Sequence, residues 1–317
     1  YVSLSKKGNN YTCCCPFHEE KTPSFVVSPQ KAIFHCFGCG AGGNVLTFIK
    51  DHEGLSFVEA VEKLAELNNV TVPRENTFGN KDFSKIHEIN DFVANYYFEA
   101  LKDSRNKSTV EYLKKRGISG QTAKNFKIGF ADFNQIELLK KLQDKFSDKE
   151  ILESGNFLKN EKGFYPFLRN RVIFPILNSS GKTIGFGGRV TDNSMPKYVN
   201  SKDSKFFNKT RELYGFNNAK KDHKSDDFIV TEGYMDVVML SEYGINNAVA
   251  SLGTAFSQNH MNSMFKLRRK ITFCFDSDEA GLRAAWRALQ ISLKNVVDDK
   301  TVRFLFLPEG YDPDSFV

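Results

Sequence analysis

The last third of the chain alternates between short, strongly apolar runs and longer segments in which apolar residues recur every three or four positions. The apolar runs predict four strands, at residues 228–231, 248–250, 270–275 and 301–307, the first of which is expected to be buried. The periodic segments between them predict helices, at residues 234–243, 260–268 and 281–293. Regular strand–helix alternation of this kind favours a doubly wound parallel sheet.

The middle of the chain mixes the two periodicities. From Lys85 onward apolar residues follow helical spacing, and a second helix is expected to close at Gly117, after two lysines and an arginine. Further on, the runs 171–176 and 183–189 flank the polar turn 179–182 and predict a β-hairpin. We therefore expect this part to be a mixed α/β subdomain.

The first segment combines a Cys- and His-rich region of short strands and turns with two helical patterns, at residues 44–50 and 56–67. Ser56 followed by Glu59 has the spacing of a helix-capping box. Residues 74–84 are polar and are expected to form a linker. The predicted parts of the chain are residues 1–75, 86–222 and 223–317, with a charged connector at 220–227 before the last.

Composition changes this picture little. The 317 residues carry 44 Lys and Arg against 38 Asp and Glu, and the net charge of +6 leans mildly toward polyanionic partners. No apolar run reaches the length of a membrane span, and the first residues are not a signal peptide. Because the chain begins with Tyr1, we expect a fragment of a longer cytoplasmic protein. The cysteines cluster near the start, which indicates one metal site in a reducing compartment, and Cys274 is expected to be a core thiol.

Two close pairs of residues have the spacing of zinc ligands. Two residues separate Cys15 from His18 and Cys36 from Cys39, and seventeen residues separate the pairs. Zinc prefers a tetrahedron of sulfur and nitrogen, and a close pair on a tight turn presents both ligands on one side. The sequence therefore predicts a small zinc-ribbon domain that gains much of its folding free energy from the metal.

The residues around these pairs leave alternatives open. Spacing favours Cys15 over Cys13 and Cys14, and His35 is a competing ligand that we expect instead at the surface near nucleic acid. Basic and aromatic residues also interleave here, as on surfaces that bind single strands. The alternative is that the phenylalanines form the core of the zinc module. The residues concerned are Lys21, Lys31, Phe25, Phe34 and Phe37.

Acidic residues follow three of the predicted strands of the alternating region. They are Glu232 and Asp236 after the first strand, Asp276 and Asp278 after the third, and Asp312 and Asp314 after the fourth. The carboxyl ends of parallel strands are where binding sites form, and gathered carboxylates repel one another unless a divalent cation is bound. Oxygen-only ligands indicate Mg²⁺ or Mn²⁺. A helix N-cap is the alternative role for Asp276 or Asp278.

In the middle region, basic residues lie in or beside glycine-containing or turn-rich segments and could complement the acidic residues of the last region. Such groups suit the binding of triphosphates and of a nucleic-acid backbone, although a solvated surface position is the alternative for any one of them. Arg189, which ends the run 185–189, is the strongest candidate. The full set is Arg116, Arg169, Arg171, Arg189, Lys197, Lys209 and Arg211.

These motifs resemble those of DnaG-type DNA primases, in order and over essentially the whole chain. The zinc region does so through Cys15-Pro16-Phe17-His18 and Phe34-His35-Cys36-Phe37-Gly38-Cys39-Gly40. The middle region does so through Tyr112-Leu113-x2-Arg116-Gly117-Ile118, Gly185-Phe186-Gly187-Gly188-Arg189, Lys197-Tyr198-x-Asn200-Ser201 and Lys209-x-Arg211-x2-Tyr214-Gly215. The last region resembles a TOPRIM fold through Glu232-Gly233-Tyr234-Met235-Asp236, Asp276-x-Asp278-x2-Gly281 and Asp312-Pro313-Asp314.

The resemblance implies an enzyme that joins ribonucleoside triphosphates on a single-stranded DNA template and leaves an RNA–DNA hybrid. Glu232 would be the central catalytic acid and Asp276 and Asp278 the principal Mg²⁺ or Mn²⁺ ligands. Asp236, Asp312 and Asp314 would support them, and Arg116, Arg189, Lys197 and Lys209 match positions associated with nucleotide or template binding. The zinc domain would help to choose the start site. A replicative helicase would bind a C-terminal domain that this chain lacks.

Two other classes of protein compete with this interpretation. A topoisomerase of the TOPRIM class needs a nucleophilic tyrosine in a separate domain, whereas Tyr234, next to the acid, is expected to be structural. A non-catalytic zinc-and-TOPRIM binding module would be favoured by degraded acidic groups, but all three groups are present. Two features depart from the family pattern, the Cys13-Cys14 pair and Glu309 in place of Asp.

Overall fold

The computed structural model describes residues 1–317 except 56, 69, 71–79, 295–298, 309 and 317. It divides into two compact units, Tyr1–Glu75 (unit 1, the first unit) and Asn76–Val317 (unit 2, the second unit). Within the described part, no helix is long and apolar enough to cross a bilayer.

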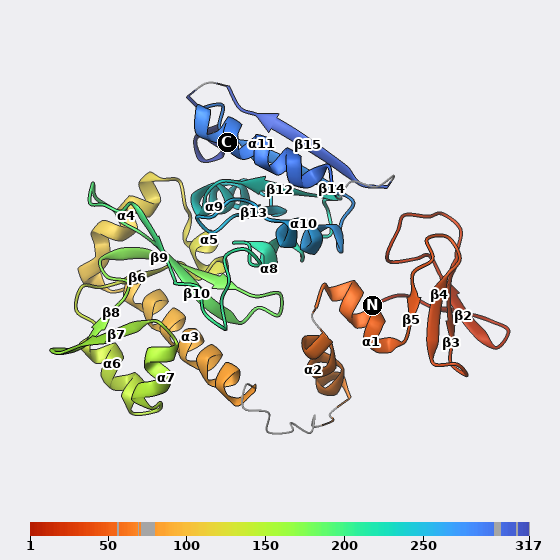
Figure 1. Ribbon diagram of the computed structural model, residues 1–317, viewed down its shortest axis with the longest axis horizontal. Helices are drawn as coiled ribbons and strands as arrows, with labels where there is room; N and C mark the ends of the chain where they lie inside the picture. Colours follow the sequence, from red (N-terminus) through yellow and green to blue (C-terminus); the bar gives the residue numbers. More distant parts are fainter. Residues whose placement is uncertain (56, 69, 71–79, 295–298, 309, 317) are drawn as a thin grey trace. The chain divides into compact units, whose positions relative to one another are not determined.

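The first unit is an antiparallel five-stranded sheet followed by two helices, at the red end of the chain in Figure 1. Phe25 and Phe34 stack in its small core, so the alternative of a core role is the one realised for both. Ser56 lies outside the described residues. The elements are β1 (Ser5–Lys7), β2 (Asn10–Cys13), β3 (Phe25–Ser28), β4 (Ile33–Cys36), β5 (Gly42–Gly43), α1 (Val45–Glu53) and α2 (Phe57–Leu67).

The second unit opens with the long helix α3 (Asn80–Leu101). The prediction of a linker over residues 74–84 is wrong from Asn80 onward, because α3 begins there. Among the side chains of this helix that the structure describes, Ile86 is the first buried one. Residues 71–79 lie outside the described part. The helix packs closely on strand β6 (Gly129–Ala131), where a Cβ on Gly129 would meet the Tyr97 backbone carbon at 2.5 Å.

An antiparallel sheet of order β11-β10-β9-β6 follows. It confirms the predicted hairpin, in which β9 (Arg171–Leu177) pairs with β10 (Thr183–Arg189), and β10 then pairs with β11 (Tyr198–Asn200). The surrounding elements are η1 (Ser104–Asn106), α4 (Lys107–Lys115), α5 (Gly120–Asn125), α6 (Ile136–Gln143), α7 (Asp148–Glu153), β7 (Phe157–Asn160), β8 (Gly163–Pro166) and α8 (Phe216–Ala219).

The predicted parallel sheet is confirmed, with strand order β13-β12-β14-β15 and every pair parallel. Since β12 lies between β13 and β14, the chain reverses its direction of winding there, and the carboxyl ends of β12 and β14 meet at a topological switch point. The elements are β12 (Asp227–Thr231), α9 (Tyr234–Glu242), β13 (Ala248–Ala250), α10 (Gln258–Phe265), β14 (Lys270–Phe275), α11 (Glu279–Ser292), β15 (Thr301–Phe306) and α12 (Pro313–Phe316).

The two four-stranded sheets of the second unit share a hydrophobic core. One cluster contains Phe174 of the antiparallel sheet, Tyr214 of the connection and Val237 of α9. The contact is so close at Gly187 that a Cβ there would overlap the Tyr234 ring. Tyr234 is 2% exposed and its hydroxyl donates to Asn200, so the prediction that this tyrosine is structural agrees with its position.

Candidate functional site

In the first unit, the strand register brings the two predicted ligand pairs together. Cys15 follows β2 and Cys36 ends β4, while His18 and Cys39 lie on the turns beyond them. The ligand atoms of these four residues all lie within 4.8 Å of one another. Within the described residues, His35 is exposed and outside this group, Cys14 is exposed, and Cys13 is half-buried in β2.

The spacing of the ligand atoms fits a tetrahedral ion. Zn–S bonds of about 2.3 Å and Zn–N bonds of about 2.0 Å place two sulfurs about 3.8 Å apart and a sulfur and a nitrogen about 3.6 Å apart. The Sγ atoms of Cys15 and Cys39 are 3.8 Å apart, and Cys36 Sγ lies 3.7 Å from His18 Nδ1. Burial raises the pKa of Cys15 to about 12, so a bound cation is needed to keep it a thiolate at neutral pH.

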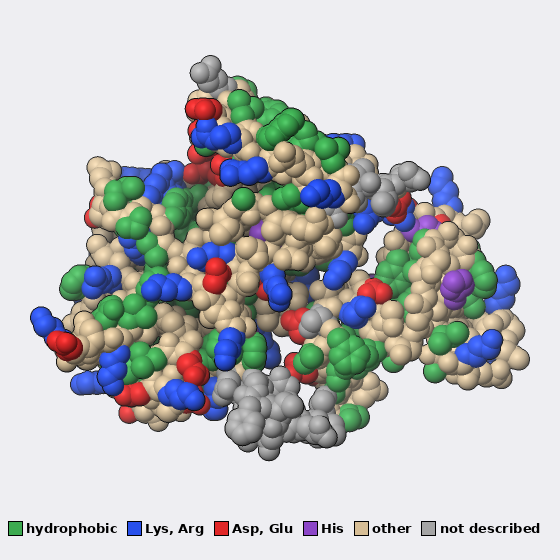
Figure 2. Space-filling view, viewed as in Figure 1, with side chains coloured by type: hydrophobic (Ala, Val, Ile, Leu, Met, Phe, Trp, Pro, Cys, Tyr) green, Lys and Arg blue, Asp and Glu red, His purple; other side chains and the backbone are tan. Residues whose placement is uncertain are grey.

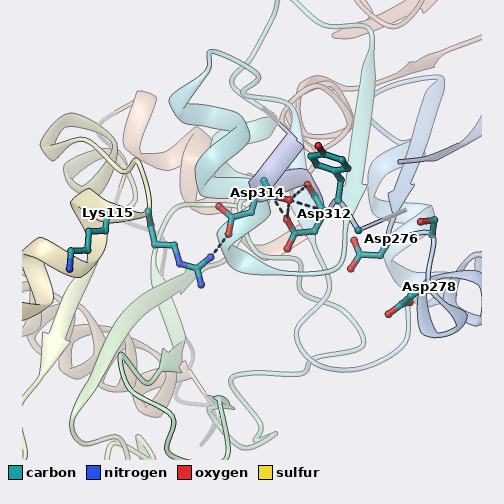
Figure 3. A pocket seen from close by; sticks show the side chains of 10 residues that line it. Lys115, Asp276, Asp278, Asp312 and Asp314 are labelled. Carbon is teal, nitrogen blue, oxygen red and sulfur yellow. Dashed lines mark hydrogen bonds and ion pairs between the residues drawn. The ribbon is translucent and has the colours of Figure 1, made fainter. Parts of the chain in front are cut away.

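In the second unit, four of the predicted acids line a single cavity of about 500 Å³. Asp276 and Asp278 come from the loop after β14, and Asp312 and Asp314 from the loop after β15 and the start of α12. Figure 3 shows these four side chains following one another along the cavity, with Lys115 at the opposite end. Among the described residues, the acids of this cavity do not form a compact ligand group like that of the zinc residues. Mg²⁺ does not need one, because it keeps several waters and takes only one or two carboxylates plus phosphate oxygens.

The other two acids lie beside this cavity and do not line it. Glu232, at the end of β12, accepts a hydrogen bond from the Asp276 backbone N–H at 3.4 Å and lines a smaller neighbouring cavity of about 220 Å³. Asp236, in the first turn of α9, accepts from the Gly233 N–H at 2.8 Å and is only 7% exposed. Asp236 is therefore largely withdrawn from the surface of the cavity.

The acids repel one another in the absence of a cation. Burial raises the pKa of Asp236 to about 7, and the nearby charges of Asp312, Asp276 and Asp314 add to the rise. Partial burial followed by neighbouring carboxylates likewise raises the pKa of Glu232 and of Asp276. This shared destabilisation of the charged forms is what a divalent cation at the cavity would remove.

Two of the acids also serve their helices. Asp278 is the N-cap of α11 and accepts the Gly281 N–H at 2.7 Å, so the N-cap alternative is realised for this residue. Asp312 accepts the Ser315 N–H at 2.9 Å at the start of α12. Both still line the cavity, so these hydrogen bonds to the helix starts do not withdraw them from the site.

Two arginines from the antiparallel half reach this region. Arg116, at the end of α4, donates to Asp314 Oδ2 at 2.8 Å and lines the cavity. This cation lowers the pKa of Asp314, although burial outweighs it and the net shift is upward. Arg189 is 3% exposed between the rings of Tyr112 and Tyr198, and its Nε and Nη1 have no hydrogen-bond partner among the described residues.

The predicted lysines lie outside the cavity lining. Lys197 is exposed, and its carbonyl accepts from Arg171. The Lys209 carbonyl accepts from Thr254 Oγ1 and lies 3.1 Å from His260 Nε2, which fixes the backbone of this loop. On the face drawn in Figure 2, Lys and Arg side chains are scattered among acids over the whole surface, so the net charge is not gathered there in one patch.

Sequence reasoning missed some of the residues that shape the site. Lys115, Tyr311 and Ser315 line the cavity, and the only signal for them was their position beside Arg116 and between the last acids. Asn200 was noted only within a motif. Its amide donates to the Leu252 carbonyl at 3.0 Å and its oxygen accepts from the Tyr234 hydroxyl, so it joins β11 to the loop after β13 and to the first residue of α9.

Comparison with known families agrees with this geometry. The family described as a CHC2 zinc finger matches residues 1–80, the N-terminal domain of the DNA primase catalytic core matches residues 96–220, and a Toprim-like family matches residues 229–317. These matches confirm the expected cofactors, one zinc ion for the Cys/His group and a divalent cation for the parallel-sheet half. Fold and site thus define a Toprim protein with an N-terminal zinc finger.

Whole-chain comparisons are more specific. The DNA primase of Pseudomonas putida is 47% identical over 328 residues, covering all of this chain and 49% of that protein. The crystal structure of the zinc-binding and RNA polymerase domains of Aquifex aeolicus primase matches with a TM-score of 0.68 and 38% identity, covering all of this chain and 77% of that one. The chain belongs to the DnaG-type DNA primase family. It spans about half the length of the curated Pseudomonas relatives it matches.

A third comparison concerns a ligand. The DnaG primase catalytic domain bound to single-stranded DNA matches with a TM-score of 0.70 and 39% identity, over 74% of this chain and 76% of that one.

Proposed function

We propose that this protein synthesises short RNA primers from ribonucleoside triphosphates on single-stranded DNA. The observation that carries the proposal is the cavity in which four carboxylates from the switch-point side of a parallel sheet face Arg116. Carboxylates for a divalent cation and a guanidinium for phosphates are the two kinds of group that nucleotidyl transfer requires. The relative bound to single-stranded DNA supports the same template for this chain.

We assign the chemistry to the acids around the cavity. Glu232 is proposed as the central catalytic acid, with Asp276 and Asp278 as principal ligands of Mg²⁺ or Mn²⁺. Asp312 and Asp314, on the same cavity wall, and buried Asp236 support them. A divalent cation held there would supply neutralising charge for the phosphoryl oxygens during transfer.

The basic residues are proposed to hold the triphosphate and the template. Arg116 is best placed for the triphosphate, because it lines the cavity and already pairs with a carboxylate. A buried guanidinium with unpartnered nitrogens carries a large free-energy cost, which an anionic ligand would offset. Arg189 is in that position, because its Nε and Nη1 have no partner among the described residues. Lys197 and Lys209 lie farther out and are proposed to contact the nucleic-acid backbone.

We propose that the zinc ion is bound by Cys15, His18, Cys36 and Cys39, and that the zinc module, residues 1–75, helps to select the start site. Residues 86–222 and 223–317 would then be the two parts of the polymerase core. Family membership is the only support for three further proposals: a replicative helicase partner, an RNA–DNA hybrid product and a cytoplasmic location.

The proposal is tested by RNA synthesis without a primer. Single-stranded DNA, the four ribonucleoside triphosphates and Mg²⁺ or Mn²⁺ are incubated with the wild-type protein, with Glu232→Gln and with Glu279→Gln. Glu279 is an exposed acid on α11 that pairs with Arg283 and lies outside the cavity, so it is a matched control. We expect short RNA from the wild type and the control, and none from Glu232→Gln.

The outcomes separate the competing functions. RNA from all three proteins would remove Glu232 from the chemistry. No RNA from a folded, zinc-loaded wild type that still binds single-stranded DNA would favour the non-catalytic binding module. Cleavage or relaxation of DNA in place of RNA synthesis would favour another Toprim enzyme.

A further inference from the structure

The carboxylate of Glu20 lies against the zinc-ligand group and is held there by hydrogen-bond donors. The backbone N–H groups of Cys15 and Ser24 donate to Glu20 Oε1 at 2.7 and 2.9 Å. The Ser24 hydroxyl donates to Oε2, and His18 Nε2 lies 3.2 Å from the same oxygen. The Glu20 side chain is 10% exposed, and a carboxylate so far withdrawn from water requires donors of this kind.

This contact decides which ring nitrogen of His18 faces the metal. His18 Nδ1 points into the ligand group, 3.7 Å from Cys36 Sγ, while Nε2 points at Glu20. A neutral imidazole carries one proton, and the nitrogen that binds a metal must be unprotonated. Because an ionised carboxylate can only accept, the proton resides on Nε2 and the lone pair of Nδ1 is left for the ion.

Two neighbours keep this arrangement in place. Ser24 Oγ lies 3.1 Å from Cys36 Sγ as well as against Glu20, so it connects the carboxylate to a second ligand. A Cβ on Gly38 would lie 2.6 Å from His18 Nε2 and 2.9 Å from Ser24 Oγ. The His18 ring and the Ser24 hydroxyl therefore fill the space that any other side chain at position 38 would need.

We infer that Glu20 is a positioning residue of the zinc centre, whose carboxylate holds the Nε2–H of His18 and thereby presents Nδ1 to the ion. Carboxylates in this outer position fix the tautomer and orientation of histidine ligands and strengthen metal binding. The inference rests on the proposed zinc ligands and is independent of primer synthesis, since metal binding is measured without the reaction.

The test compares Glu20→Gln with Glu19→Gln in the full chain. Glutamine at position 20 keeps an oxygen for the backbone donors but turns an NH₂ toward the Nε2–H of His18, whereas Glu19 is exposed. Zinc affinity is measured by competition with a chromophoric chelator, and we expect Glu20→Gln to weaken it about 10- to 100-fold while Glu19→Gln stays near the wild type. Nitrogen-15 NMR of the zinc-loaded protein should show the His18 Nε2–H hydrogen-bonded in the wild type and lost in Glu20→Gln.

Two results would overturn the assignment. Equal zinc affinity in the two variants would mean that the carboxylate does not support the metal. Weakened affinity with an unchanged Nε2–H signal would mean that Glu20 acts only by folding the loop around Cys15 and Ser24. Each result is read directly from zinc binding and the histidine ring, so neither depends on whether RNA is made.

Discussion

At the scale of single residues, the raised pKa of Asp236 shows that the metal-free site destabilises a charged carboxylate. Its pKa is raised from near 4 to about 7, chiefly by burial and further by the charges of other acids. A carboxyl that binds its proton more tightly when folded favours the folded state at low pH, and this stability is lost as pH rises through the window between the two values. The metal-free protein therefore carries the largest penalty above about pH 7.

Asp236→Asn should remove this penalty. Without added divalent cation, we expect the variant to melt close to the wild type near pH 4 and increasingly above it as the pH rises to about 7, by roughly 2–4 °C for each kcal/mol of penalty relieved. The Gly233 N–H keeps an acceptor, because asparagine retains the side-chain oxygen. Thermal unfolding across this pH range measures the difference, and a difference that does not change with pH would contradict the assignment. Saturating Mg²⁺ should shrink it.

Asp276→Asn tests a ligand position directly. The hydrogen bond that joins this residue to Glu232 comes from its backbone, so the variant should keep the local fold. We expect RNA synthesis to be abolished while binding to single-stranded DNA remains nearly unchanged. Asp144→Asn, at an exposed acid beyond α6, is the control. If Asp276→Asn still synthesises RNA, the proposal that Asp276 is a metal ligand is wrong.

Sequence pattern found the acids but not their partners. Each acid follows a strand or opens a helix, and strand ends are visible in the hydrophobic pattern. The ion pair of Arg116 with Asp314 joins residues 198 positions apart, and no local pattern reports such a pairing. The second use of Asp278, as the N-cap of α11, was one of two readings that the sequence allowed, and only the backbone of α11 decides it.

At the scale of elements, the parallel sheet was predictable because β12, β13 and β14 are largely buried and so mostly apolar, whereas β15 at the edge of the sheet is mostly exposed. The start of α3 was not predictable, since its first residues are polar and resemble a linker. The close contact between β10 and α9 could not be predicted from the sequence either, because it joins residues that are far apart along the chain. In the sequence, the glycines of β10 were noted only as part of the run that ends at Arg189, whereas the structure shows that Gly187 allows close packing against Tyr234.

Gly187→Ala should therefore act through stability. The added methyl would overlap a ring that is 2% exposed, and forcing extra volume into a packed core typically costs about 1–3 kcal/mol. Gly120→Ala is the matched control, because nothing lies within 4 Å of a Cβ at that position in α5. Denaturant unfolding should show a lower midpoint for Gly187→Ala alone; equal midpoints would show that the ring can move aside.

At the scale of the whole molecule, the two units should lose their structure independently. Unit 1 has a small core in which two of the proposed zinc ligands, Cys15 and Cys36, are themselves buried members. In such a module, the free energy of metal binding contributes directly to the free energy of folding. Unit 2 has three larger clusters of its own, and none of them includes a residue of the zinc group.

Cys36→Ser should therefore lower the zinc content and unfold unit 1 alone. Hydrogen exchange is expected to speed up across β2 to β4 and to stay unchanged in the two sheets of unit 2. Cys14→Ser, at an exposed cysteine outside the ligand group, should leave one zinc per chain. Unchanged zinc stoichiometry in Cys36→Ser would remove this residue from the ligand set.

The core that the two sheets of unit 2 share limits how this protein can be recombined. A chimera that takes β12 to β15 from one primase and β6 to β11 from another must carry over both halves of the contact between Gly187 and Tyr234, together with Asn200. The charged connector 220–227 lies between the two four-stranded sheets in the sequence. The sheets nevertheless pack against each other in one hydrophobic core. The exchangeable module is thus the whole of unit 2, and grafts made at that connector should yield insoluble protein unless the interface residues are transplanted with them.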